Sequence, residues 1–213
     1  MRPEPLIDRL TSDLKPVRRR TALNDALTLA VLGGIELGLF LAFGFMRGDM
    51  PMAVHLPSFW WKLTSLGLIA LVSSTVAVLS LDPLESPRRG LRWLFVLVAV
   101  CLSIGWLLDA SRAGLSVLAM RLDWPHGVEC FGEMVGLSVP AFVALGLLMR
   151  RGAPTDSGAT ALAAGLAAAA WGAFVFVFAC PFDDPLYVAV WYSLGCGTVT
   201  LLARLTLPRL TRW

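Results

Sequence analysis

Two cysteines lie among acidic residues and are the side chains of this sequence best suited to chemistry. Cys130 lies in the segment WPHGVECFGE, and Cys180 lies in ACPFDDP. Thiolates bind soft metal ions such as Cd²⁺, and two neighbouring thiols can form or open a disulfide. The polar neighbours that could share such a site are His126, Glu129, Glu133, Asp183 and Asp184. The alternative is a static disulfide or two unrelated thiols at a membrane interface.

The sequence as a whole is too apolar for an ordinary globular domain. Of its 213 residues, 57% are hydrophobic and 15% are charged, and the mean hydropathy is +0.71. Such a composition is typical of an integral membrane protein. Spanning a hydrocarbon core about 30 Å thick requires about 20 helical residues. Six apolar stretches are long enough: 24–46, 60–81, 91–110, 128–149, 159–179 and 187–207.

Apolar runs of this length, without period-two alternation, form helices rather than barrel strands because lipid cannot satisfy backbone polar groups. We therefore predict an all-α membrane protein with a six-transmembrane-helix bundle over residues 24–213. A short polar arm, residues 1–23, precedes this bundle.

The predicted fold brings the two cysteines together. The spans 128–149 and 159–179 are joined by a short turn, so they should pack antiparallel. Cys130, at the start of one span, and Cys180, after the other, then lie at the same depth. The candidate metal ligands are Cys130, Cys180, Glu133, Asp183 and Asp184. Cys101 and Cys196 lie within spans and are predicted to be small packing residues.

The distribution of basic residues predicts the orientation. Of the 18 Lys and Arg residues, 14 lie on the side that holds both termini, and 4 lie on the other side. Basic residues concentrate in the cytoplasmic loops of membrane proteins. Both termini are therefore predicted to be cytoplasmic, and the two cysteines face the outer, oxidising compartment.

The arm, residues 1–23, is predicted to contain a short amphipathic helix. Leu6, Leu10 and Leu14 recur every four residues with Ile7 beside them, and Pro16 should end the helix. A helix this short needs a partner for its apolar face. The periodicity leaves two partners open: a lipid surface, which suits the basic run 18–20, or the groove of a soluble protein.

Glu36 is an acid near the middle of the first span. A charged carboxylate at this depth costs about 2.5–3.5 kcal/mol, so the side chain should face protein. It could belong to a proton or ion pathway. We favour an acid that joins helices through a hydrogen bond, with Ser73, Ser74 or Thr75 as partner.

Motifs of familiar enzyme classes are absent from the sequence. The two histidines, His55 and His126, lie in predicted outer loops, which leaves a Ser–His protease or a His-Glu-x-x-His metalloprotease without its residues. Walker, dinucleotide-binding and Cys-x-x-Cys motifs are also missing. We therefore predict no enzymatic activity.

Short motifs along the whole sequence resemble those of the NrsF-type six-span anti-sigma factors, which hold extracytoplasmic-function (ECF) sigma factors inactive at the bacterial inner membrane. The motifs are Leu6-Ile7-Asp8-Arg9-Leu10 with Pro16-Val17-Arg18-Arg19, Phe59-Trp60-Trp61-Lys62-Leu63, Cys130 after Trp124, Ala153-Pro154, Cys180 followed by Asp183-Asp184-Pro185, Trp191-Tyr192, and Arg212-Trp213. This sequence has Ala179 where the family has a histidine, which weakens metal binding more than redox sensing.

The resemblance implies an inner-membrane protein whose arm binds an ECF sigma factor, with no direct contact to nucleic acid. The sigma-binding residues would be Leu6, Ile7, Leu10, Leu14 and Val17. The resemblance also implies that Cys130 and Cys180 sense heavy metal or oxidant, so that a soft metal ion would be a regulatory ligand rather than a required cofactor. Membrane lipids would be the second partner, through Arg18 to Arg20.

Two other functions stay open at the level of sequence. Glu36 and the outer acids would suit a small transporter or channel for a metal ion or small solute. Cys130 and Cys180 would suit a membrane thiol oxidoreductase, but that class normally has a second thiol pair, which the sequence does not provide.

Overall fold

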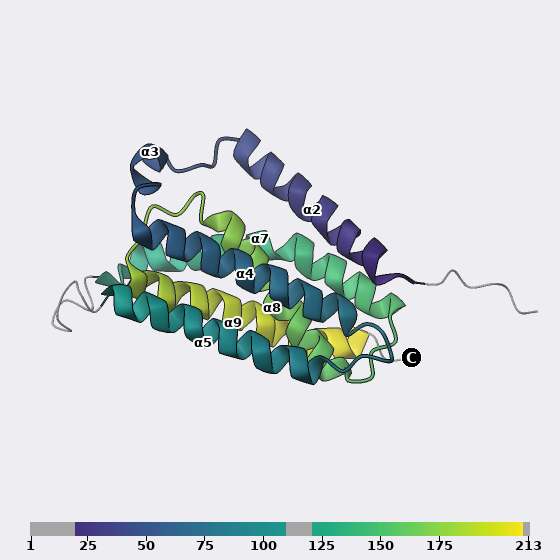
Figure 1. Cartoon of the computed structure of the whole chain (residues 1–213). Coiled ribbons are helices and arrows are strands. Elements are labelled where there is room, and N and C mark those ends of the chain that lie inside the picture. Colours follow the sequence, from purple (N-terminus) through teal and green to yellow (C-terminus); the bar gives the residue numbers. More distant parts are fainter. Residues whose placement is uncertain (1–19, 110–120, 211–213) are drawn as a thin grey trace, which may run out of the picture.

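The structure is a computed structural model that describes residues 20–109 and 121–210, and within these ranges all regular structure is helical (Figure 1). The helices are α2 (Ala22–Ala42), α3 (Met50–Ala53), α4 (Pro57–Leu79), α5 (Pro87–Asp109), α7 (Trp124–Arg151), α8 (Ser157–Phe176) and α9 (Pro185–Leu210). Six of them, all except α3, are long and apolar enough to cross a membrane. The predicted all-α class is confirmed, and the six predicted spans correspond to six helices of sufficient length and apolar composition.

Successive long helices run antiparallel and give the bundle two distinct ends (Figure 1). One end, called the cysteine end, holds Cys130 and Cys180. The opposite end, called the arginine end, holds the start of α2, the end of α9 and the turns that contain Arg88 and Arg150. Both described chain ends therefore lie on the same side of the bundle.

The alanine-rich helix α8 forms the centre of the bundle. It packs against α4, α7 and α9, and most of its residues are buried. Its small side chains allow this close approach: a Cβ on Gly172 would lie 2.6 Å from the backbone nitrogen of Ser138 in α7, and one on Gly165 would lie 2.9 Å from Cα of Thr200 in α9. Close helix contact through small residues is how helices associate in lipid, where apolar burial gives no driving force.

Helix α2 is attached to this bundle much more loosely. Asp25 and Gly33 are its only buried residues, and Figure 1 shows its axis inclined to the other helices. It packs closely at Gly33, where an added Cβ would lie 2.7 Å from the Trp171 ring of α8. At the arginine end, Arg20 pairs with Asp25 and donates to the Val78 carbonyl of α4 at 3.1 Å. The first span is therefore a peripheral helix held at a few points.

The predicted first span extends to residue 46, but α2 ends four residues earlier, at Ala42. A turn follows, in which Gly44 has φ of 77°, a conformation that residues with side chains rarely adopt. This turn directs the chain back over the bundle, where the backbone N–H of Arg47 donates to the carbonyl of Phe178 at 2.9 Å. The early end of α2 thus brings Arg47 to the cysteine end.

Gly172→Leu should destabilise the bundle because the new side chain would overlap the backbone of α7. We expect a loss of about 1–3 kcal/mol or more in the free energy of unfolding, measured by denaturant titration of the purified protein in detergent micelles. Gly136→Leu in α7 is the matched control, since nothing lies within 4 Å of a Cβ there. Equal stability of the two variants would contradict the close α7–α8 packing.

Candidate functional site

The structure brings Cys130 and Cys180 together at the cysteine end. Cys130 lies in the second turn of α7, and Cys180 lies in the segment that joins α8 to α9. The two thiols interact directly, and both are free and buried. The hydroxyl of Tyr187 in α9 donates to Sγ of Cys130 at 3.2 Å. Two helices, α7 and α9, and the segment between α8 and α9 therefore contribute to the thiol pair.

Aromatic side chains enclose the thiol pair. Tyr187, Trp191 and Phe176 belong to the same buried cluster as the two cysteines. The ring of Trp191 reaches across α7 because residue 127 is glycine, where any Cβ would overlap it, and its indole N–H donates to the Leu122 carbonyl at 2.8 Å. Reagents must therefore be small, or the surrounding segment must move, for the thiols to react.

Two buried cations hold the segment that contains Cys180. Arg47 donates to the carbonyl oxygens of Cys180 and Pro181 at 2.9 and 3.1 Å. Lys62 of α4 donates to those of Cys180 and Phe182 at 3.3 and 3.0 Å. The side chains of Arg47 and Lys62 are 3% and 0% exposed. The backbone beside the thiol pair is thus fixed by charged groups from two other parts of the chain.

Asp183 balances these two cations. One carboxylate oxygen lies 2.7 Å from Nη1 of Arg47, and the other lies 2.8 Å from Nζ of Lys62. Asp49 forms a second, more exposed pair with Arg47 at 2.6 Å. The hydrogen bond to Asp49 raises the pKa of Arg47, which burial alone would lower, and Asp183 raises it further. Because a buried charge without a partner is costly, these groups depend on one another.

Asp184 has partners different from those of Asp183. It pairs with Arg121 at 2.8 Å and accepts the backbone N–H groups of Leu186 and Tyr187, so it caps the start of α9. Burial raises the pKa of Asp184, but the hydrogen bonds from Arg121 and the backbone outweigh burial and hold it below its usual value. Asp183 and Asp184 are therefore both committed to structural partners.

The five candidate metal ligands do not form one cluster in this structure. Among the described residues, no group of three or more His, Cys, Asp or Glu side chains is placed to hold a metal ion. Glu133 is exposed on α7, and His126 interacts with Asp123 at 2.9 Å. The donors that do lie together are the two thiols, so metal binding by the full set stays a prediction.

The surroundings of Cys180 favour its thiolate. The hydrogen bond from Cys130 lowers the pKa of the Cys180 thiol, burial raises it, and the positive charge of Lys62 lowers it, so that the pKa lies below its ordinary value. The thiolate is the form that attacks oxidants and binds soft metals. The site therefore has one activated thiol with a second thiol beside it, the arrangement that disulfide formation requires.

Arg47 and Lys62 are the site residues that sequence reasoning missed. Both are among the four basic residues on the side with few charges, and Lys62 also lies in the motif Phe59-Trp60-Trp61-Lys62-Leu63. Because so few basic residues lie on that side, each of them was a candidate for a role in a site. Their partners at residues 180–183, however, are separated from them by 118 to 136 residues, so spacing could not identify these contacts.

Glu36 forms a different contact from the one predicted. Its Oε2 accepts the indole N–H of Trp171 in α8 at 3.0 Å. Ser73 and Thr75 instead donate to carbonyls of their own helix, those of Ile69 and Leu71. The acid does join two helices, as we favoured, but the partner helix is α8 rather than α4.

The predicted sigma-binding residues lie outside the described part of the chain. They are Leu6, Ile7, Leu10, Leu14 and Val17. Their roles stay predictions.

The fold and the site define a multi-pass membrane protein with a buried, charge-supported thiol pair at one end of its helices. Residues 10–213 match the model of the NrsF family, described as "Negative regulator of sigma F", so the chain belongs to this family. The resemblance noted from the sequence is confirmed. Family membership favours a regulator over an enzyme.

Two curated relatives carry the same description. The chain is 29% identical over 218 residues to "Anti-sigma-F factor NrsF" of Caulobacter vibrioides, with 100% of both chains covered. It is also 29% identical over 181 residues to "Probable anti-sigma-F factor NrsF" of Azospira oryzae, with 82% of both covered. No solved structure matches the chain significantly.

Lys62→Met should shift the reactivity of Cys180 to higher pH. In the wild type, the alkylation rate of Cys180 by iodoacetamide should rise at a lower pH than that of an ordinary thiol, because the thiolate forms at lower pH. Loss of the Lys62 charge raises the pKa of the thiol and moves this rise upward. The rates can be measured by mass spectrometry of the peptide that contains Cys180. Arg88→Met, at the arginine end, should leave the profile unchanged; identical profiles for Lys62→Met and wild type would exclude the electrostatic role.

Proposed function

We propose that this protein is a bacterial inner-membrane anti-sigma factor of the ECF type. In this proposal, the arm, residues 1–23, sequesters the sigma factor, and reaction of Cys130 and Cys180 with an oxidant or a soft metal ion releases it. The observation that carries the proposal is the activated, paired thiol site at the cysteine end, in a chain that belongs to a family of sigma regulators.

The charge distribution supports an orientation with the arginine end in the cytoplasm. The described part of that end carries Arg20, Arg88, Arg89, Arg92, Arg150, Arg151, Arg204 and Arg209, whereas Arg47, Lys62 and Arg121 lie at the cysteine end. The latter three are all paired with aspartates. Basic residues mark the cytoplasmic side, so the arm would meet its sigma factor there and the thiols would face the periplasm.

The arm supplies the surface for a sigma factor. Both relatives are named for action on sigma F, and the helix predicted from Leu6, Leu10 and Leu14 has an apolar stripe that a groove in a soluble protein could cover. Ile7 lies beside this stripe, and Val17 follows Pro16, where the helix is predicted to end. The bundle has no other described cytoplasmic segment of comparable length, since the turns 80–86 and 152–156 are short.

The thiol pair supplies the sensing chemistry. Hydrogen peroxide would take two electrons from the Cys130 thiol and the Cys180 thiolate: its O–O bond breaks, the one thiol proton goes to the products, which are water and hydroxide, and an S–S bond forms. A soft divalent metal would instead displace this one proton and bind both sulfurs as thiolates. Either reaction changes the distance and charge between α7 and the segment after α8. Oxidation removes the thiolate charge that faces Lys62, and a metal ion would compensate it.

Arg47 supplies a route from this segment to the arm. Its side chain binds the Cys180 and Pro181 carbonyls and Asp183, and it follows the end of α2 by five residues. Helix α2 is held to the bundle at few points and leads directly to the arm. A displacement of residues 180–183 would therefore move α2 more readily than any other span, and packed helices respond by such small discrete shifts.

The sigma-release experiment tests the proposal as a whole. The full-length protein, purified from membranes of its own cells, should carry an ECF sigma factor identifiable by mass spectrometry, and hydrogen peroxide or Cd²⁺ should release it. Cys130→Ser and Cys180→Ser should each abolish or lock this response, whereas Cys101→Ser should respond like the wild type. Leu10→Asp should lose the sigma factor, because a charge enters the apolar stripe. Equal effects of all cysteine variants, or capture unaffected by Leu10→Asp, would refute the proposal.

Arg47→Met should uncouple the thiols from the arm. Asp183 keeps Lys62 as its partner in this variant, so the site stays charge-balanced. Oxidation should still form the disulfide, but it should no longer weaken sigma binding by the roughly 5- to 150-fold typical of allosteric coupling. Arg121→Met, which removes a cation paired with Asp184 at the same end, is the matched control and should keep the coupling. The measurement is the affinity of each variant for the purified sigma factor before and after oxidation. Equal loss of affinity on oxidation in Arg47→Met and Arg121→Met would contradict the role of Arg47.

A further inference from the structure

The two thiols at the cysteine end have different polar neighbours. The carbonyl oxygen of Cys180 lies 2.9 Å from Nη1 of Arg47 and 3.3 Å from Nζ of Lys62. Sγ of Cys130 instead accepts the hydroxyl of Tyr187 at 3.2 Å, and its own thiol donates to Cys180. The thiol pair therefore has cations at the Cys180 side and a neutral hydrogen-bond donor at the Cys130 side.

These neighbours place the negative charge of the pair on Cys180. Two adjacent sulfurs do not readily ionise together, because like charges repel in a buried site. The positive charge of Lys62, whose side chain is 0% exposed, favours the thiolate at Cys180, and the remaining proton stays on Cys130. Since the thiolate is the nucleophilic form, Cys180 is the sulfur that attacks an oxidant, and Cys130 is the sulfur that reacts second.

The burial of both thiols restricts the oxidant. Cys180 is 0% exposed and Cys130 is 6% exposed, and the rings of Tyr187, Trp191 and Phe176 belong to the same buried cluster. A charged or bulky oxidant would have to lose its hydration and open these closely packed walls. Hydrogen peroxide is uncharged and little larger than water, and thiolates attack its O–O bond to give sulfenic acids. A small hydroperoxide is therefore the class of oxidant that suits this site.

Tyr187 is held beside Cys130 by both its backbone and its ring. Its backbone N–H donates to Asp184 at 3.2 Å in the cap at the start of α9, and its ring stacks on Phe182 with centroids 4.7 Å apart. The side chain is fully buried. Its hydrogen bond orients Sγ of Cys130 next to Cys180 and stabilises the negative charge that develops on this sulfur when its proton leaves.

On the basis of the proposed thiol-sensing function, we propose that a small hydroperoxide oxidises Cys180 first, to a sulfenic acid, and that Tyr187 positions Cys130 for the second step. With hydrogen peroxide, the Cys180 thiolate attacks one oxygen: an S–O bond forms, the O–O bond breaks and hydroxide leaves. Sγ of Cys130 then attacks Sγ of Cys180: an S–S bond forms, the S–O bond breaks, and the Cys130 proton leaves with the hydroxyl group as water. Both electrons pass from sulfur to the peroxide in the first step.

Trapping of the sulfenic acid tests the order of the two steps. The full-length protein in detergent micelles is treated with hydrogen peroxide and dimedone, and mass spectrometry measures the adduct on each cysteine peptide. Cys130→Ser should accumulate the adduct on Cys180, whereas Cys180→Ser should form the adduct on Cys130 about tenfold more slowly. An adduct that forms on Cys130 as fast as on Cys180, or a folded wild type that hydrogen peroxide does not oxidise, would overturn the proposal.

A bulkier hydroperoxide tests the restriction on the oxidant. tert-Butyl hydroperoxide contains the same O–O bond with a larger group attached. When each rate is divided by the rate with free glutathione, this reagent should oxidise Cys180 about tenfold more slowly than hydrogen peroxide does. Equal relative rates would contradict the preference for a small oxidant.

A further set of variants tests the role of Tyr187. Tyr187→Phe removes only the hydroxyl and keeps the ring that stacks on Phe182. In the Cys130→Ser background, it should leave the rate of adduct formation at Cys180 within about twofold; with both cysteines present, it should slow disulfide formation by about two- to tenfold, the effect of one lost hydrogen bond. Thr198→Val, which removes a hydroxyl that bonds within α9, is the matched control. Thermal unfolding checks that each variant is folded, and equal rates of disulfide formation in Tyr187→Phe and Thr198→Val would refute the positioning role.

These measurements need no sigma factor, so their outcome is separate from that of the sigma-release experiment. Oxidation in the stated order without release of a sigma factor would support the thiol chemistry and refute the sensing function. Release of the sigma factor by hydrogen peroxide with first oxidation at Cys130 would support the sensing function and overturn the assignment of the two thiols.

Discussion

The pairing of Arg47 and Lys62 with Asp183 is the interaction on which the cysteine end depends. Two cations and one carboxylate are buried there, and their hydrogen bonds fix the carbonyls of residues 180–182. Removing Asp183 would leave Lys62 without a carboxylate partner among aromatic side chains. The segment between α8 and α9 is short and irregular, and these bonds give the carbonyls of Cys180, Pro181 and Phe182 their partners. The position of Cys180 therefore depends on the two cations as well as on the bond from its N–H to the Phe176 carbonyl at the end of α8.

The same arrangement gives Cys180 two separate roles. Its side chain belongs to the thiol pair, and its carbonyl oxygen is a partner of both cations. Chemistry at the sulfur therefore acts on the residue whose backbone binds Arg47. The stable part of the molecule, the packing of α8 against α4, α7 and α9, need not change for this connection to operate. The centre of the bundle can stay rigid while the loosely attached helix α2 moves.

The sequence predicted those features that depend on local patterns. Long apolar runs identified six spans, and the short connection between two of them placed Cys130 and Cys180 at one end. Features that depend on distant pairs were not predictable in this way. Asp183 and Asp184 are candidate metal ligands by sequence, but the sequence does not show that Lys62, Arg47 and Arg121 pair with them. Glu36 was expected to bond to a serine or threonine, since only the packing of α2 across α8 reveals Trp171.

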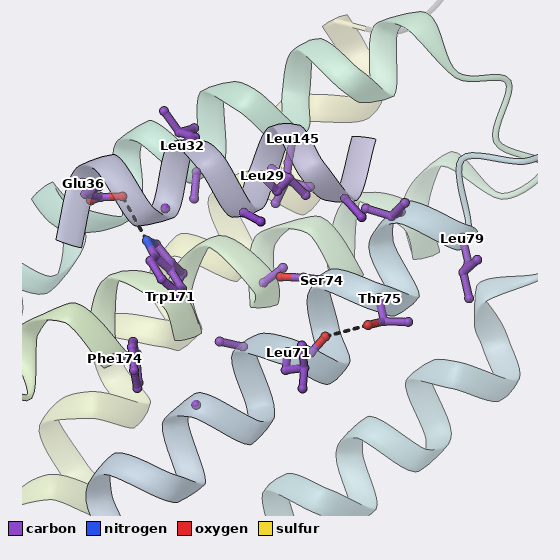
Figure 2. Close-up of a pocket in the computed structure, with 18 of the residues that line it drawn as sticks. Leu29, Leu32, Glu36, Leu71, Ser74, Thr75, Leu79, Leu145, Trp171 and Phe174 are labelled. Carbon is purple, nitrogen blue, oxygen red and sulfur yellow. Dashed lines mark hydrogen bonds between the residues drawn. The ribbon is translucent and has the colours of Figure 1, made fainter. Parts of the chain in front are cut away.

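The contact of α2 with Trp171 has a mechanical consequence. Gly33 and Glu36 form this contact in the half of the helix that ends at Ala42 (Figure 2). With a rise of about 1.5 Å per residue, roughly 9 Å of helix lie between it and Ala42, and roughly 17 Å lie between it and Ala22. At its start, α2 is held again, where Arg20 donates to the Val78 carbonyl of α4. A small sideways step of the Ala42 end, near Arg47, would therefore tilt α2 about the Trp171 contact and act on the Arg20 contact, where α2 meets the arm.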